Sequence, residues 1–225
     1  MALEFDLANW MPQLLRGLVI TIEITALCIA LGMVLGLALT MARLYGQRPV
    51  YWLATIYINF FRGTPILVQL FIVYYGLPSM GLDFSPFTAG VLALGLNTSA
   101  YQSEYFRGAI QSLPSGQMLA ARSLGMSRAL ALRWIVLPQA LRLVIPPWSN
   151  ELILMLKYSS IVFFATVTDL MGAGRIIAGE TFRYFEVFIL VALMYLAIVL
   201  LLSVGLRWLE NRLRVPGLGS AGASA

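Results

Sequence analysis

Five long apolar stretches constrain this sequence more than any other feature. A helix needs roughly 20 mostly apolar residues to cross the hydrocarbon core of a bilayer. Five stretches reach that length: residues 17–42, 52–77, 87–106, 148–168 and 187–206. Of the 225 residues, 11% are charged, whereas a soluble domain carries about 25%. We therefore expect an all-α membrane protein with five transmembrane helices.

The arginines indicate how these helices are oriented, because cytoplasmic loops carry an excess of positive charge. Ten of them lie on one side of the predicted spans: Arg43, Arg48, Arg107, Arg122, Arg128, Arg133, Arg142, Arg207, Arg212 and Arg214. The other side has three, Arg16, Arg175 and Arg183. This distribution predicts an N-terminus outside the cell and a C-terminus in the cytoplasm. Residues 216–225, which carry no charge, are predicted to form a disordered tail.

The residue types that are missing exclude several kinds of active site. There is no histidine, which excludes His-dependent catalytic triads and His-ligated metal sites. The single lysine, Lys157, is not preceded by the glycine-rich sequence of a phosphate-binding P-loop. The basic residues lie between apolar runs, so we expect no nucleic-acid partner. We predict no catalytic residue, metal or cofactor in this chain, and any ATP would be bound by a partner subunit.

Two predicted spans carry small or polar residues on one helical face. In the first span these are Thr21, Thr25, Cys28, Gly32, Gly36 and Thr40, and in the third they are Gly90, Ala93, Asn97, Tyr101, Glu104 and Gly108. Close helix packing explains the first stripe, since a Gly-x-x-x-Gly pair lets backbones approach in lipid; a solute path is the alternative. In the third span, Asn97 and Glu104 would contact solute, or Glu104 would form an ion pair with Arg107.

Polar and charged side chains inside the predicted spans are candidates for a solute pathway. A charge at the bilayer centre costs on the order of 3 kcal/mol, so such residues line cavities or pair with one another. The missing backbone donor of Pro65 also predicts a kink after Arg62. The cations and carboxylates would suit a zwitterionic solute, or they would neutralise one another as structural pairs. The candidates are Arg62, Thr64, Asn97, Tyr101, Glu104, Glu151 and Lys157.

The connection between the third and fourth spans contains a basic, amphipathic segment, residues 117–138. The pattern predicts a short helix over residues 117–124 that stops at Gly125 in a left-handed conformation. A second short helix then leads to Pro138, and Pro146 and Pro147 are expected in the first turn of the fourth span. Such a segment would lie on lipid headgroups, or it would dock its apolar face into a groove of a partner protein.

The motifs in and around this segment resemble those of a known family. Ala120-Ala121, Gly125 and Ile135-Val136-Leu137-Pro138 resemble the EAA signature of bacterial ABC importer permeases. Further stretches resemble the polar amino acid branch of that family: Phe61-Arg62-Gly63-Thr64-Pro65, Leu67-Val68-Gln69-Leu70-Phe71, Tyr101-Gln102-Ser103-Glu104-Tyr105-Phe106-Arg107-Gly108, Leu137-Pro138-Gln139-Ala140-Leu141-Arg142 and Asn150-Glu151-Leu152-Ile153-Leu154-Met155-Leu156-Lys157. The resemblance covers roughly residues 12–214 in the family's order.

The resemblance implies a MetI-like type I importer transmembrane domain over residues 1–215, in the bacterial inner membrane. It implies three kinds of partner: two copies of an ABC ATPase, a second permease that is identical or homologous, and an extracytoplasmic binding protein. The coupling helix of such permeases sits in a cleft of the ATPase. The residues that match it here are Gln117, Leu119, Ala120, Ala121, Arg122, Leu124, Gly125, Ser127 and Arg128.

Two departures from the family pattern affect the expected chemistry. Leu119 replaces the acidic residue of the signature, which removes a charge from the coupling helix, and Tyr158 follows Lys157 where the family often has Asp or Asn. We predict an ATP-driven importer of polar amino acids, with glutamate or aspartate slightly favoured over glutamine, histidine or cystine. The alternatives are a passive membrane channel or scaffold that is not coupled to an ATPase, and then a membrane enzyme.

Overall fold

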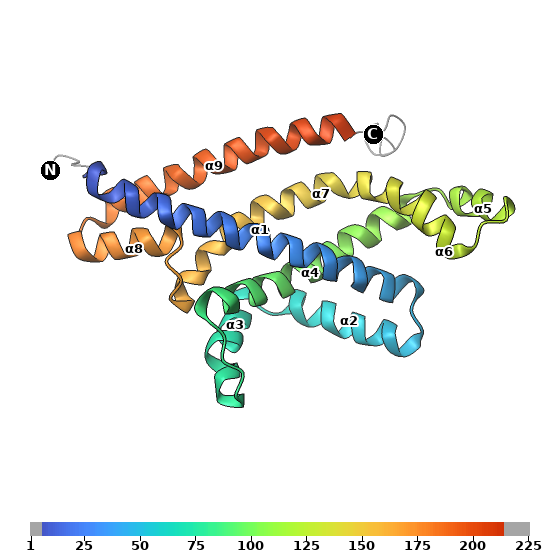
Figure 1. Cartoon of the computed structure of the whole chain (residues 1–225), viewed down its shortest axis with the longest axis horizontal. Helices are drawn as coiled ribbons and strands as arrows, with labels where there is room; N and C mark the ends of the chain where they lie inside the picture. The colour runs from blue at the N-terminus through green and yellow to red at the C-terminus, as the bar shows by residue number, and fades with distance from the viewer. Residues whose placement is uncertain (1–5, 214–225) are drawn as a thin grey trace.

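The computed structural model describes residues 6–213, and all of the regular secondary structure in that range is helical (Figure 1). The longer helices are α1 (Leu7–Tyr45), α2 (Arg48–Gly63), α4 (Pro86–Ser112), α7 (Leu137–Tyr158) and α9 (Tyr184–Leu213). The shorter ones are α3 (Ile66–Phe71), α5 (Ser115–Ser123), α6 (Arg128–Ala131) and α8 (Leu170–Thr181), with π-helical turns at Ile72–Gly76 and Leu132–Val136 and 3-10 turns at Leu77–Met80 and Ser159–Ala165. The predicted tail, residues 216–225, lies outside the described residues.

The number of spans that the structure supports is smaller than the predicted five. By length and composition, three helical segments in residues 6–213 can cross a bilayer: Leu7–Tyr45, Arg128–Ala165 and Tyr184–Leu213. The bent pair Arg48–Gly63 and Ile66–Met80 adds a fourth if it is counted as one span. Helix α4 has 27 residues, but the buried polar side chains of Asn97 and Gln102 make it less apolar. Five spans and the orientation of the termini therefore stay predictions.

The second predicted span is not one straight helix. The pair Arg48–Gly63 and Ile66–Met80 is bent by 107°, which confirms the kink expected at Pro65. Thr64 and Pro65 are both extended, with ψ of 147° and 133°. The reason is that Pro65 has no backbone N–H and disfavours a helical conformation of the residue before it.

The expectation that Pro146 and Pro147 lie in the first turn of the helix that forms the fourth span is wrong. Helix α7 begins at Leu137, continues directly from α6 through a π-helical turn, and has Pro146 and Pro147 in its interior. Ala140 and Val144, about two turns and less than one turn before these prolines, are buried in one cluster with Phe106 and Ala109 of α4. This tertiary packing compensates for the backbone hydrogen bonds that the two prolines remove.

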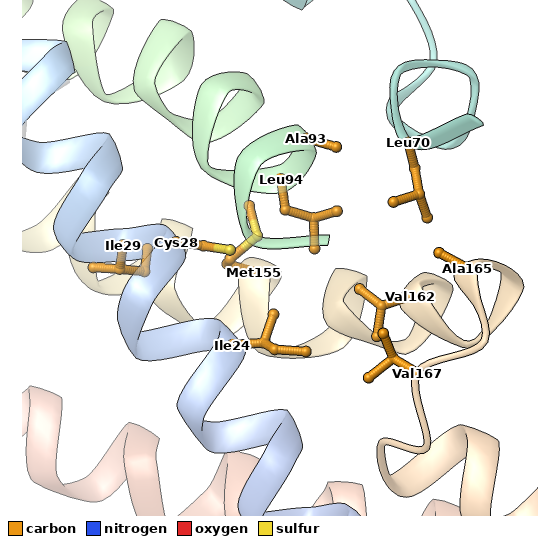
Figure 2. Close-up of a cluster of buried hydrophobic side chains, with 10 residues drawn as sticks. All are labelled: Ile24, Cys28, Ile29, Leu70, Ala93, Leu94, Met155, Val162, Ala165 and Val167. Atoms are coloured by element: carbon orange, nitrogen blue, oxygen red, sulfur yellow. The ribbon is translucent and has the colours of Figure 1, made fainter. Parts of the chain in front are cut away.

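The core lies where α1, α4, α7 and the 3-10 turn Ser159–Ala165 meet. Figure 2 shows Ile24 and Cys28 of α1 beside Leu94 of α4 and Met155 of α7. Toward the other end of α1, a Cβ on Gly36 would lie 3.0 Å from the carbonyl oxygen of Ser99. The part of the small-residue stripe from Cys28 to Thr40 therefore packs directly against α4.

Helix α8 ties the starts of α1 and α9 together through a residue that the sequence did not single out. Asp169 is fully buried and caps α8, because its Oδ1 accepts a hydrogen bond from the Gly172 N–H at 2.9 Å. Its Oδ2 accepts bonds from the hydroxyls of Tyr195 on α9 at 3.3 Å and of Thr21 on α1 at 3.5 Å. Loss of hydration on burial raises the pKa of the Asp169 carboxyl to about 6, although the hydrogen bonds to its carboxylate act in the opposite direction and lower the pKa.

Candidate functional site

A cavity of about 240 Å³ lies between α4, α7 and the bend that separates α2 from α3. This size suits a small polar solute better than a drug-sized ligand. Its described lining residues are Thr64, Pro65, Ile66, Asn97, Tyr101, Tyr105, Glu151, Leu154 and Tyr158. Four of the predicted pathway residues, Thr64, Asn97, Tyr101 and Glu151, meet here.

Glu151 is the acidic residue among the described lining residues of this cavity. Its side chain is only 5% exposed, and none of the other described lining residues is charged. The Thr98 hydroxyl donates to Oε1 at 2.7 Å, and the Tyr105 hydroxyl donates to Oε2 at 3.0 Å. Both donors are neutral, so the lining does not balance the charge of an ionised Glu151. A buried carboxylate in this state attracts a cation.

Asn97 shapes the cavity through a network that holds the bend. Its Nδ2 donates to the Phe61 carbonyl and to Gln69 Oε1, each at 2.9 Å. Gln69 in turn donates to the Thr64 hydroxyl at 2.7 Å. The unpaired backbone groups at the Pro65 break are thus satisfied by side chains, which fixes the wall that carries Thr64.

Three predicted pathway residues do not line this cavity. Arg62 is exposed at the bend and its guanidinium lies 5.3 Å from the ring centroid of Tyr101. Glu104 forms ion pairs with Arg43 and, at 2.6 Å, with Arg107, as the ion-pair alternative expected. Lys157 lies on the other side of α7 from the cavity and borders a separate groove with Tyr195. The reason is geometric, since adjacent helical residues point about 100° apart, and Tyr158 takes the cavity side.

The predicted coupling segment lies at the end of the molecule opposite α8 (Figure 1). Helix α5 ends at Ser123, and Gly125 has a left-handed φ of 83°, which confirms the predicted stop. The Ser127 hydroxyl caps α6 by accepting from the Leu130 N–H at 3.2 Å. Leu119 and Leu124 are 69% and 84% exposed, so this end presents apolar side chains outward.

Its predicted contact residues differ in how much they are exposed. Ala121 is buried. The others are exposed: Gln117, Leu119, Ala120, Arg122, Leu124, Gly125, Ser127 and Arg128.

Comparison with known proteins assigns this arrangement to a family. Residues 28–215 match the family described as "Binding-protein-dependent transport system inner membrane component". The chain belongs to this family. Among curated relatives, this permease is 40% identical over 193 residues to the probable glutamine ABC transporter permease protein GlnM of Bacillus subtilis strain 168, covering 86% of this chain and 89% of GlnM. It is 38% identical to the glutamine transport system permease protein GlnP of Escherichia coli K12, covering 95% and 100% of the two chains.

Solved structures agree with that assignment. The permease superposes on a chain of an amino acid ABC transporter crystallised with histidines with a TM-score of 0.88, at 39% identity, covering 94% of this chain and 100% of the other. It also resembles the MetNI methionine ABC transporter in an inward-facing form, with a TM-score of 0.78 at 20% identity, covering 92% and 99%. At 20% identity, the similarity to the MetNI transporter supports the fold assignment alone. The MetI-like importer fold expected from the motifs is therefore confirmed.

Thr98, Tyr105 and Gln69 are not among the predicted pathway residues, although all three shape the cavity. Gln69 and Tyr105 stand only within the motifs that resemble the family. Thr98 and Tyr105 follow Asn97 and Glu104 by one residue each and are seven residues apart, so they share a face of α4. Widening the polar stripe of the third predicted span by one position would have included both. Gln69 carries no such signal, because its role depends on the bend that brings α3 back toward α4.

Proposed function

We propose that this permease is the membrane-spanning subunit of an ATP-driven importer of polar amino acids. Glu151 carries the proposal, because a buried carboxylate with only neutral partners suits the ammonium group that every amino acid zwitterion carries. Thr64 and Asn97 offer polar groups to the rest of the solute. Arg62, stacked on Tyr101 at the rim, is placed to attract the solute carboxylate.

The rest of the pathway is proposed on the same basis. Five spans, with α4 as the third, would place the N-terminus outside and the C-terminus in the cytoplasm of a bacterial inner membrane. Glu104 is already paired with two arginines, and Lys157 lies outside the cavity. These two residues would affect the local charge balance or the contacts between subunits more than the binding of solute. A second permease, identical or homologous, would cover the exposed apolar faces, and an extracytoplasmic binding protein would deliver solute.

The ATPase contact is proposed at α5 and the turn after it. Leu119 and Leu124 would enter a groove on each of two ATPase copies, with Arg122 and Arg128 beside them. Gln117, Ala120, Gly125 and Ser127 would lie at the edge of this contact. This chain would hydrolyse no ATP itself.

The side chain of the solute is less constrained than its ammonium group. The sequence slightly favours glutamate or aspartate. A second carboxylate would meet Glu151 and no lysine or arginine among the described lining residues, and this favours a neutral polar side chain. The names of GlnM and GlnP point to glutamine, which has such a side chain.

Uptake into proteoliposomes tests this function. The permease, its ATPase and its binding protein are reconstituted, and uptake of radiolabelled glutamine and glutamate is followed with and without ATP inside. We expect ATP-dependent uptake that is lost when the ATPase is left out. Equal uptake with and without nucleotide would favour a passive channel, and preferential uptake of glutamate would support the acidic alternative.

A further inference from the structure

A second cavity lies in the groove between α4 and α7 and has no assigned role. Its volume is about 350 Å³. Its described lining residues are Glu104, Tyr105, Gly108, Ala109, Ser112, Leu143 and Pro147.

The two cavities follow one another along the groove. On α4 the first is lined by residues 97, 101 and 105 and the second by residues 104–112. On α7 the first is lined by residues 151, 154 and 158, and the second by residues 143 and 147. Tyr105 is the one described residue that lines both. The second cavity lies toward the end of α4 that leads into α5, and therefore toward the proposed ATPase contact.

A hydrogen bond holds Tyr105 at this junction. Its hydroxyl donates to Oε2 of Glu151 at 3.0 Å, the same carboxylate that we propose for the solute ammonium. Thr98 already occupies Oε1. Tyr105 lines the same cavity as Glu151, so an ammonium that reaches Glu151 from this cavity competes with the phenol for Oε2. The ammonium adds the attraction between two opposite charges, which the neutral phenol lacks.

We propose that Tyr105 is a gate between the two cavities, and that the ammonium of a bound amino acid opens it by displacing the Tyr105 hydroxyl from Glu151. The second cavity is then the exit site for the same solute. This inference rests on the proposed function, because it takes the solute ammonium to bind Glu151. In the structure described here the Tyr105 hydroxyl is bonded to Glu151, which is the closed state of the proposed gate.

The charges of the second cavity suit release. Its carboxylate, Glu104, is neutralised by Arg43 and Arg107, so it holds an ammonium less strongly than Glu151 does. A Cβ on Gly108 would meet no atom within 4 Å, which leaves open space beside the gate. Solute thus passes from a cavity with an unbalanced negative charge to one where that charge is already paired.

Replacing Tyr105 by Phe tests the gate, since it removes the hydroxyl and keeps the ring. The full transporter complex is reconstituted into proteoliposomes loaded with radiolabelled glutamine, and efflux is measured without ATP. We expect efflux roughly tenfold faster than in the wild type, the factor that loss of one hydrogen bond to a charged group allows. Tyr57→Phe is the matched control, because its hydroxyl bonds to Leu96 and Ser99 on α4 and lines neither cavity.

A second readout keeps the test decisive if efflux is complicated by other leaks. Leu154→Cys places a thiol in the first cavity, and a membrane-impermeant thiol reagent is supplied from the α5 side. The native Cys28 is fully buried and adds no background. We expect labelling of this thiol to be slow alone, about tenfold faster with Tyr105→Phe and unchanged with Tyr57→Phe.

The outcomes separate this inference from the proposed function. If glutamine binds the complex but Tyr105→Phe changes neither efflux nor labelling, the gate is overturned and the importer proposal stands. If no amino acid binds the wild-type complex at all, the proposed function fails first. Should Tyr105→Phe not be recovered as a folded complex, Tyr105→Met removes the same hydroxyl, and the same two measurements decide.

Discussion

At the scale of single residues, Glu151 is the side chain that most affects the chemistry of the first cavity. A carboxylate that is removed from water and bonded only to hydroxyls destabilises the folded protein, so a role other than stability is expected for Glu151. The hydrogen bonds from Thr98 and Tyr105 fix its orientation toward the cavity. Its function is therefore best tested by removing the charge while keeping the shape.

Glu151→Gln is expected to weaken glutamine binding to the complex by about 10- to 100-fold, because one hydrogen bond to a charged group contributes about 1.5–3 kcal/mol. Calorimetric titration of the purified complex in detergent measures this. Glu180→Gln, at an exposed position of α8, is the matched control and should bind as the wild type does. Unchanged affinity in Glu151→Gln would contradict the ammonium site.

The sequence predicted some of the residues that line the first cavity and misplaced others. Thr64, Asn97, Tyr101 and Glu151 do line one cavity. Lys157 does not, because a one-residue step around α7 separates its direction from that of Tyr158, and periodicity alone cannot say which face of a helix meets its neighbour. That choice depends on how α4 and α7 pack, and the packing is a property of the whole fold.

Close contact between α1 and α4 is the main packing feature at the scale of helices. The backbones approach at Gly36, and Thr40 adds a hydrogen bond from its hydroxyl to the Ser103 carbonyl at 2.8 Å. The Gly-x-x-x-Gly spacing predicted such an approach but not its partner. The length of α7 could not be predicted in the same way, because Pro146 and Pro147 are ordinarily signals for the start of a helix.

Gly36→Leu should separate α1 from α4. Its Cβ alone would lie 3.0 Å from the Ser99 carbonyl oxygen and 3.1 Å from the Ser103 nitrogen, which leaves no room for the rest of the leucine side chain. Overpacking costs typically 1–3 kcal/mol, and about 2–4 °C of unfolding temperature is lost per kcal/mol in a chain of this size. Gly205→Leu, where no atom lies within 4 Å of a Cβ, is the control. Thermal unfolding in detergent compares the two, and equal unfolding temperatures would contradict the contact.

Asp169 predicts how the joint of α1, α8 and α9 responds to pH. Its pKa is raised from 3.8 to about 6 in the folded protein, so between these values the folded state binds more protons than the unfolded state. The free energy of unfolding should therefore fall as pH rises from about 4 to about 6. Above about pH 6 the contribution of Asp169 to it should be constant. The unfolding temperature of the wild type, measured relative to that of Asp169→Asn, should fall by several degrees between about pH 4 and about pH 6. A constant difference between the two proteins would contradict the raised pKa.

At the scale of the whole molecule, both cavities lie along α4, and the predicted coupling segment follows the same helix in the chain. Helix α4 carries both cavities along its length and then leads directly into α5 through Leu113 and Pro114. A force applied at α5 can therefore reach the second cavity through a single helix. The motifs predicted the segment and the turn at Gly125, whereas this continuity with the groove required the structure.

Gly125→Trp is expected to release the ATPase while the permease still inserts and folds. The large side chain would project from an exposed turn beside Leu124, and the left-handed φ of 83° at this position would strain any residue with a Cβ. Co-purification of the ATPase with tagged permease from detergent extracts measures the association.

Gly125→Asn separates the effect of bulk from the effect of backbone strain, because asparagine tolerates the left-handed conformation and adds little bulk. It should therefore retain most of the ATPase. Gly179→Trp, at an exposed position of α8 at the opposite end of the molecule, should retain it fully. If Gly125→Trp also keeps the ATPase, this turn is not the contact, and the exposed leucines beside it lie against lipid headgroups instead.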